Sequence, residues 1–313
     1  QQTKALMWEA LIPPDGKFTV TGTSVKSQLH SVPACQGICK KAIASRLGEA
    51  YLMETLPETG AEYTVKVTIL KDRVTLTVDT SGSGLHKRGY RVKTVAAPIK
   101  ETLAAAMVQL SFWNKDRVLL DPCCGSGTIA IEAAMIGRNI APGLSRSFAC
   151  EEWEAIDKKL WKEEKKRAYD LMDDEAKLDI VAIDIDKMAI EAAKENAIEA
   201  GVDDCIRFIN ADMARIKASK PSGIIITNPP YGERIGEQRQ IAAIYSKYKK
   251  FFAENPSWSM FMVTTDKDIE AKVFGRKADR RRKLYNGRLE VCYYQFHGKK
   301  LGDNGKAKQP EQK

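Results

Sequence analysis

Four consecutive residues, Asn228, Pro229, Pro230 and Tyr231, follow an apolar run and carry the most specific chemistry in the sequence. Two prolines after a buried strand end its hydrogen-bond ladder and stiffen the chain. An exocyclic base amine is a poor nucleophile because its lone pair is delocalised into the ring. The Asn228 amide oxygen and the Pro229 carbonyl can accept its two N–H bonds, while Tyr231 stacks on the ring. The motif predicts a catalytic clamp for a base amine, with a tight turn that positions a structural tyrosine as the alternative.

A second cluster lies near residue 121, where a predicted strand, a glycine turn and a helix follow one another. In this context a glycine motif is credible as a cofactor loop, because glycines permit positive φ and the helix N-terminus offers unpaired N–H groups. A dinucleotide would fit the glycines about as well, but the preceding Asp121 carboxylate repels a pyrophosphate and attracts a cation. S-adenosylmethionine carries an ammonium and a sulfonium, so Asp121 favours it, unless Asp121 only caps the turn. The predicted cofactor residues of this loop are Asp121, Cys123, Gly125, Gly127 and Thr128.

Two further carboxylates follow predicted strands of the same sheet. Asp184 ends an apolar run at a position suited to the ribose hydroxyls, although it lies 59 residues after Gly125 instead of the usual ~20. Asp186 competes for this role, but it is better placed to cap the helix that follows. Asp212 follows the next strand and can accept a hydrogen bond from an adenine amino group. We therefore add Asp184 and Asp212 to the predicted cofactor site.

The elements that must position these residues alternate between short apolar strands and helices from Pro98 onward. This rhythm is typical of a parallel sheet covered on both faces, so we predict an α/β, Rossmann-like domain. An insertion at 141–178 is expected to form a solvated helix with one docked face. The predicted strands are 117–121, 180–184, 206–210, 223–227, 259–264 and 289–296.

The preceding residues indicate a small α+β unit, with a helix over 33–48 and a β-hairpin at 65–78. A glycine-rich basic segment follows at 81–91, of a type that can cradle phosphates with backbone N–H groups. A flexible surface loop is the alternative. The cations assigned here to RNA binding are Lys40, Lys41, His86, Lys87, Arg88 and Arg91.

The densest basic run lies near the C-terminal end, at 275–287. Its cations beside Tyr285 suit phosphate contact with base stacking, and a solvated hairpin loop is the alternative. A loop this late in such a sheet is expected to rim the substrate cleft. The predicted RNA contacts are Arg280, Arg281, Arg282 and Lys283.

Composition narrows the class of protein. Fifty Lys and Arg against forty-one Asp and Glu give a net charge of +9, which favours an anionic partner such as nucleic acid. Seven cysteines without a C-x-x-C pair and three scattered histidines predict neither a disulfide framework nor a metal site. No apolar run approaches the ~20 residues that span a bilayer, which predicts a soluble protein. The unpaired cysteine pattern fits a reducing cytosol, so a cytoplasmic location is expected. The chain begins at Gln1 within polar sequence, which suggests missing N-terminal material.

Together the two motifs, Asp121-Pro-Cys-Cys-Gly-Ser-Gly-Thr and Thr227-Asn-Pro-Pro-Tyr-Gly-Glu-Arg, resemble the class I S-adenosylmethionine-dependent amino-methyltransferases. The segment from Ser27-Gln-Leu-His-Ser to Lys87-Arg-Gly-Tyr-Arg resembles a THUMP RNA-binding domain. The whole is similar to the bacterial large-subunit rRNA guanine-N2 methyltransferases, often labelled predicted N6-adenine-specific DNA methylases.

The resemblance implies a THUMP domain at 1–95 with its N-terminal part missing and a methyltransferase domain at 96–298, while the polar composition of 299–313 predicts a disordered tail. The resemblance further implies S-adenosylmethionine as cofactor, 23S rRNA as partner, a role in rRNA processing, and methyl transfer to a guanine N2 amine. Two alternatives stay open. One is an adenine-N6 DNA methyltransferase, since the Asn-Pro-Pro-Tyr motif accepts either amine. The other is a catalytically silent RNA-binding or ribosome-assembly factor.

Overall fold

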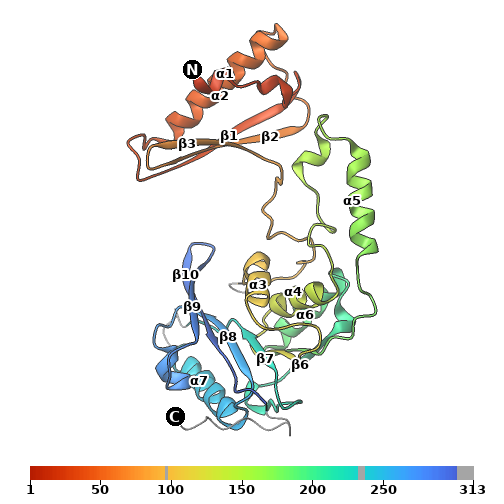
Figure 1. The fold of residues 1–313 in the computed structure, drawn as a ribbon, viewed down its shortest axis with the longest axis vertical. Helices are drawn as coiled ribbons and strands as arrows, with labels where there is room; N and C mark the ends of the chain where they lie inside the picture. The colour runs from red at the N-terminus through yellow and green to blue at the C-terminus, as the bar shows by residue number, and fades with distance from the viewer. Residues whose placement is uncertain (96–97, 232–236, 302–313) are drawn as a thin grey trace. The chain divides into compact units, whose positions relative to one another are not determined.

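The computed structural model divides into two compact units (Figure 1). The first contains residues 1–85 and 146–167, and the second contains residues 86–145 and those from 168 onward. The chain therefore passes between the units three times. The structure describes residues 1–95, 98–231 and 237–301, so most of the predicted tail lies outside the described residues.

One long helix and a three-stranded sheet make up most of the first unit. Strand β1 (Lys17–Val25) pairs in parallel with β2 (Glu62–Leu70), and helix α2 (Val32–Tyr51) connects them. Strand β3 (Arg73–Asp79) pairs antiparallel with β2, which confirms the predicted hairpin. Alternate residues of β2 are buried and pack against the apolar face of α2. Two short helices precede the sheet, α1 (Gln2–Ala5) and η1 (Trp8–Ala10).

Residues 146–167, which lie within the insertion predicted at 141–178, belong to the first unit. Their anchor is Trp153, which is 2% exposed and stacks on Tyr63 of β2 with 4.7 Å between ring centroids. The indole N–H donates to the carbonyl of Glu62 at 2.9 Å. A buried aromatic ring with a satisfied N–H fixes the segment to this core, while the helix that follows has no buried residues. The insertion contains η2 (Ala149–Glu152) and α5 (Lys158–Asp170).

A seven-stranded sheet forms the centre of the second unit, in the order β6-β5-β4-β7-β8-β10-β9. The first five are parallel, and β10 is antiparallel to both of its neighbours. The strands are β4 (Leu119–Asp121), β5 (Ile180–Asp184), β6 (Ile206–Asn210), β7 (Ile224–Thr227), β8 (Ser259–Thr264), β9 (Arg280–Asn286) and β10 (Leu289–Phe296).

Helices cover both faces of this sheet, which confirms the predicted Rossmann-like α/β class (Figure 1). One core cluster combines side chains of α3, α4 and α6 with alternate strand residues, and the other combines α7 with the remaining strand residues. The helices are α3 (Glu101–Gln109), α4 (Thr128–Gly137), α6 (Lys187–Glu199) and α7 (Glu237–Glu254), with short turns η3 (Asp203–Cys205), η4 (Met213–Arg215) and η5 (Glu270–Phe274).

The basic run near the C-terminal end is a strand, whereas the sequence predicted a loop. Residues of β9 pair with β10 through a turn at Gly287, whose φ is +67°. The strand escaped prediction because it lies at the sheet edge and consists mainly of charged, exposed residues, so it lacks apolar alternation. Cations on such an edge also discourage pairing with another chain.

The strand order decides where the site lies. The chain runs outward from β4 through β5 to β6, then returns to place β7 on the other side of β4. Ligands of open α/β sheets bind at the carboxyl ends of the strands where the order reverses in this way. The loops that follow β4 and β7 therefore meet at one edge.

Candidate active site

A cavity of about 710 Å³ opens at the carboxyl ends of β4, β5, β6 and β7. The loop after β4 and the loop after β7 both line this cavity, although they lie far apart in the sequence. All four residues of the predicted clamp, Asn228 to Tyr231, line it. The predicted cofactor residues that line it are Asp121, Cys123, Gly125, Thr128, Asp184 and Asp212.

Gly127 is absent from the cavity wall, but it has the positive φ that the sequence predicted for this turn. It caps α4 at its N-terminal end with a φ of +81°, a conformation that favours glycine. A Cβ at this position would lie 2.9 Å from the Cβ of Ala193 on α6. Gly127 thus shapes the turn and permits the close packing of α4 on α6.

Asp121 is the most strongly perturbed carboxyl group of the cavity. It is fully buried, its Oδ1 accepts a 3.4 Å hydrogen bond from the Cys123 N–H, and its Oδ2 has no hydrogen-bond partner among the described residues. Burial raises the pKa of Asp121 from 3.8 to about 8, the Cys123 N–H lowers it, and the neighbouring Asp184 carboxylate raises it. A buried carboxyl with a spare oxygen at a cavity wall is suited to receive a cationic ligand.

Asp184 and Asp186 make different contacts at the end of β5. Asp184 Oδ2 accepts a 2.9 Å bond from the N–H of Gly125, so it also fixes the glycine turn. Asp186 Oδ1 accepts a 2.9 Å bond from the N–H of Met188 and caps α6. That bond confirms the predicted cap and leaves Asp184 as the carboxylate at the tip of β5.

Asp212 meets a partner that sequence reasoning missed. Its two carboxylate oxygens lie 2.6 and 2.8 Å from Nζ of Lys247 on α7. The Ala214 N–H and then the Lys247 ammonium lower the pKa of Asp212. Lys247 lines the cavity, but no signal in the sequence separates it from neighbouring lysines of the same helix.

The predicted clamp follows the buried strand β7 and lies next to a cluster of buried polar side chains. In this state the Tyr231 hydroxyl donates to Asn228 Oδ1 at 2.5 Å, so the acceptor assigned to a target amine is already matched to a donor. Beneath it, the fully buried Tyr248 hydroxyl lies 3.2 Å from Thr227 Oγ1 and 3.7 Å from Cys123 Sγ. Burial and the neighbouring Asp121 carboxyl group raise the pKa of the Cys123 thiol to about 12, which favours its protonated form.

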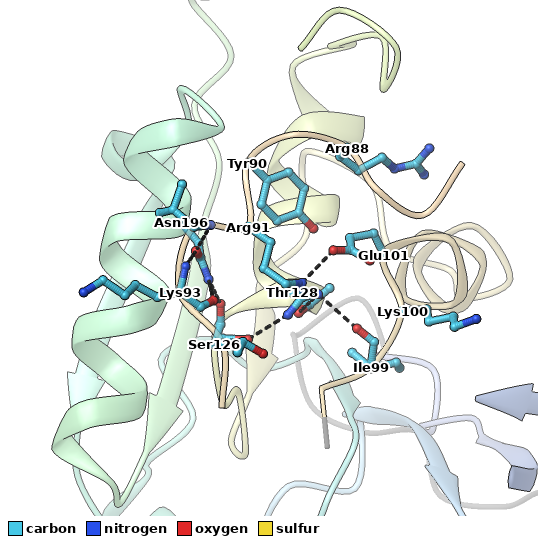
Figure 2. A network of polar contacts seen from close by, with 12 residues as sticks. Arg88, Tyr90, Arg91, Lys93, Ile99, Lys100, Glu101, Ser126, Thr128 and Asn196 are labelled. Carbon is cyan, nitrogen blue, oxygen red and sulfur yellow. Dashed lines mark hydrogen bonds and ion pairs between the residues drawn. The ribbon is translucent and has the colours of Figure 1, made fainter. Parts of the chain in front are cut away.

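Arg88 and Arg91 are not the exposed cations that the sequence predicted, and Figure 2 shows the contacts of Arg91. The Arg88 guanidinium forms a 3.3 Å ion pair with the buried Glu132. Arg91 forms a 2.6 Å ion pair with the buried Glu101. Both arginines are largely buried, because each neutralises a carboxylate that the fold removes from water. We therefore remove them from the RNA-binding set.

The glycine-rich loop also differs from its predicted use as a phosphate cradle. The N–H groups of Ser81 and Gly82 donate to the Asp79 carboxylate. Carbonyls of Ser81, Ser83 and Gly84 instead accept from the guanidinium of Arg146, at 3.0, 2.5 and 2.9 Å. The loop thus wraps a cation of its own unit.

The other predicted RNA contacts remain predictions. Lys40, Lys41 and Lys87 are exposed and His86 is half-buried, while Lys40 also lies 3.6 Å from Glu58. On β9, Arg281 lies 3.7 Å from Glu270 and Lys283 lies 2.6 Å from Glu290. Within the described ranges, the exposed Arg280 and Arg282 have no ion-pair partner closer than 4 Å.

Among the described residues, no group of three or more His, Cys, Asp or Glu side chains is arranged to hold a metal ion. None of the helices described is long and apolar enough to cross a bilayer.

Comparisons with known proteins agree with this geometry. A family model described as "RMKL-like, methyltransferase domain" matches residues 88–295, and a THUMP domain model matches residues 1–79. The chain is 48% identical over 303 residues to "Putative RNA methyltransferase YpsC" of Bacillus subtilis, covering 96% of this chain and 78% of that protein. It is 40% identical over 248 residues to "Ribosomal RNA large subunit methyltransferase K/L" of Shewanella baltica.

That second match covers 76% of this chain but only 34% of the longer Shewanella protein. Among solved structures, SMU.472, described as "a putative methyltransferase complexed with SAH", superposes with a TM-score of 0.89 at 43% identity. The match covers 96% of this chain and 80% of that one. The chain belongs to the RMKL-like methyltransferase family and carries a THUMP domain ahead of its catalytic domain.

Proposed function

We propose that this protein transfers a methyl group from S-adenosylmethionine to the N2 amine of a guanine in 23S rRNA. The methyl donor is S-adenosylmethionine, and S-adenosylhomocysteine is its product. The observation that carries the proposal is the shared cavity, whose walls hold the unpaired Asp121 oxygen and the Asn228 amide together.

The residues present fit the cofactor. The free Oδ2 of Asp121 is suited to the methionine ammonium, and the Asp184 carboxylate at the tip of β5 is placed for the ribose hydroxyls. Asp212, held by Lys247, is placed for the adenine amino group. Bound there, the cofactor supplies an electrophilic methyl group on a positively charged sulfur.

The chain's own residues then act on the target amine. Asn228 Oδ1 and the Pro229 carbonyl accept its two N–H bonds, which favours the more tetrahedral nitrogen of the transition state. The nitrogen forms the new N–C bond as the S–C bond breaks. Because the methylated amine is strongly acidic, it loses one proton to water without a strong base. Tyr231 leaves Asn228 Oδ1 to the incoming amine and stacks on the base.

RNA is the substrate class that we favour. A THUMP domain model matches residues 1–79, and the chain has a net charge of +9. The Bacillus relative is named an RNA methyltransferase and the Shewanella relative a ribosomal RNA methyltransferase. The base itself must be extruded from its stack to reach the clamp.

Nucleoside analysis tests the target directly. Matched RNA and DNA substrates are methylated with labelled S-adenosylmethionine, digested, and separated as nucleosides. We expect N2-methylguanosine from RNA. N6-methyladenine without N2-methylguanosine would support the adenine rival and overturn the guanine assignment, because the Asn-Pro-Pro-Tyr clamp accommodates either amine.

Two variants test the division of roles within the cavity. Asn228→Ala should abolish turnover while leaving the affinity for S-adenosylhomocysteine within about twofold. Asp184→Ala should weaken cofactor binding first, since it loses both the ribose contact and the bond to Gly125. Titration calorimetry and single-turnover kinetics separate these effects. Equal loss of binding and turnover in both variants would refute the assignment, and no binding by the unaltered protein would favour a silent RNA-binding factor.

A further inference from the structure

Within the second unit, residues 90–93 lie against the cofactor loop (Figure 2). The central side chain of this segment is Arg91, whose Nη1 donates to Ser126 Oγ at 3.0 Å and whose Nη2 donates to Thr128 Oγ1 at 2.9 Å. The same guanidinium binds Glu101 Oε1 at 2.6 Å and the Ile99 carbonyl at 3.1 Å. One side chain therefore joins the glycine turn to α3 and to the chain preceding α3.

Asn196 on α6 makes a second connection between the same segments. It is fully buried, and its Oδ1 accepts from the N–H groups of Val92 and Lys93 at 3.0 and 2.9 Å. Its Nδ2 donates to the carbonyls of Lys93 and Ser126 at 2.9 and 3.1 Å. Both donor hydrogens and both acceptor positions of the amide are used. This geometry fixes the backbone of the segment to the backbone of the cofactor loop.

These contacts reach the ligand only through the loop. Ser126 and Thr128 line the cavity and are each 3% exposed, whereas none of residues 90–93 lines it. The loop contains Gly125 and Gly127 at positive φ, so its own conformational preference is weak. A loop that is held in its binding conformation beforehand loses less entropy when the ligand arrives.

We propose that Arg91 and Asn196 are positioning residues that hold the cofactor loop in its binding conformation. Through them, the segment 90–93 becomes part of the cofactor site without touching the ligand. The proposal rests on the cofactor assignment above and is independent of which base or nucleic acid is methylated. Because binding free energies are reciprocal, a ligand that stabilises the loop must also stabilise the segment.

Reciprocity gives a test that needs no variant. Hydrogen exchange of the backbone amides of Val92 and Lys93 is measured with and without S-adenosylhomocysteine. We expect ligand to slow their exchange at least fivefold, since both amides donate to Asn196. Unchanged exchange at these two amides in protein that binds the ligand would overturn the proposal.

A matched pair of variants distinguishes positioning from general stability. Arg91→Met removes the four contacts, and Arg138→Met serves as control. Arg138 is a similarly buried arginine at the opposite end of α4, where it binds Asp204 and the Gly201 carbonyl away from the cavity. We expect Arg91→Met to weaken S-adenosylhomocysteine binding at least tenfold and to raise the KM for the methyl donor similarly. Turnover at saturating donor should stay within threefold.

The control should lower the melting temperature by a comparable amount and leave ligand affinity within twofold. Arg91→Lys, which retains the ion pair with Glu101 but not the two contacts to the loop, should bind with intermediate affinity. If the unaltered protein binds S-adenosylhomocysteine, equal loss of affinity in Arg91→Met and Arg138→Met would refute the proposal. Unchanged affinity in Arg91→Met would also refute it. Absence of ligand binding by the unaltered protein would instead remove the cofactor assignment on which the proposal rests.

Discussion

Replacing Asp121 by Asn should make the ligand-free protein more stable and a poorer binder of its cofactor. Burial raises the pKa of Asp121 from 3.8 to about 8. Below pH 3.8 the Asp121 carboxyl group is protonated in both the folded and the unfolded state, so its ionisation does not change the free energy of unfolding. Between pH 3.8 and about 8, Asp121 is ionised in the unfolded state and neutral in the folded state. Unfolding therefore becomes more favourable as the pH rises through this range.

The size of this effect follows from the two pKa values. Each pH unit above 3.8 lowers the free energy of unfolding by ~1.4 kcal/mol, which gives roughly 4 kcal/mol at pH 7 and roughly 2 kcal/mol at pH 5. Asn keeps the acceptor for the Cys123 N–H and does not ionise. For a unit of this size, the ligand-free melting temperature of Asp121→Asn should rise by about 10 °C at pH 7 and by much less at pH 5.

Cofactor affinity should change in the opposite direction. A hydrogen bond to a charged group contributes roughly 1.5–3 kcal/mol, so loss of the carboxylate should weaken S-adenosylmethionine binding on the order of 10- to 100-fold. Thermal unfolding from pH 5 to pH 8 and titration calorimetry measure the two effects. Glu175→Gln, an exposed carboxylate away from the cavity, is the control and should change neither.

Three outcomes would contradict this role of Asp121. If Asp121→Asn is no more stable than the unaltered protein at pH 8, Asp121 is not held neutral by burial. If the stability gain is present but independent of pH, its cause is packing rather than ionisation. If cofactor affinity is unchanged, the cationic part of the ligand does not contact Asp121.

Trp153→Ala should lower the melting temperature of the first unit, since a large buried ring is lost at a cost of roughly 3–5 kcal/mol, while calorimetry shows cofactor affinity of the second unit unchanged. Lys247→Met should leave the Asp212 carboxylate without its cation and raise the KM for S-adenosylmethionine roughly three- to tenfold, because two charge-assisted contacts are lost. Replacing Arg280 and Arg282 by Ala should weaken RNA binding. It should also reduce the slope of log affinity against log salt concentration by the amount expected for about two phosphate contacts.

Each of these has a control or a contrary outcome. A single unfolding transition in which cofactor affinity falls together with stability would contradict the first. An unchanged KM in a folded Lys247→Met variant would contradict the second. For the third, the matched control replaces Lys115 and Lys158 by Ala, two exposed lysines outside the predicted RNA contacts that pair with Asp173 and Glu152. An unaltered salt slope in the Arg280 and Arg282 double variant would indicate that β9 is only a solvated edge strand.

The motifs could be read from the sequence because their chemistry is local. Strands buried on both faces must be apolar along their whole length. This pattern identified six of the seven strands of the large sheet in advance. Residues at their carboxyl ends then had to share an edge, so Asp121, Asp184 and Asn228 could be assigned to one site before any coordinates. The Asp186 cap was predictable for the same reason, since a cap lies within a few residues of the helix it serves.

The tertiary structure alone decided which charges are used within the fold. Arg91 is a basic residue in a glycine-rich segment, as an RNA-binding residue would be, yet it binds Glu101 and the cofactor loop. Asn196 and Lys93 meet across 103 residues of sequence. The pairing of charges depends on distances in space that no local pattern encodes, and for that reason the clamp was foreseeable while its support was not.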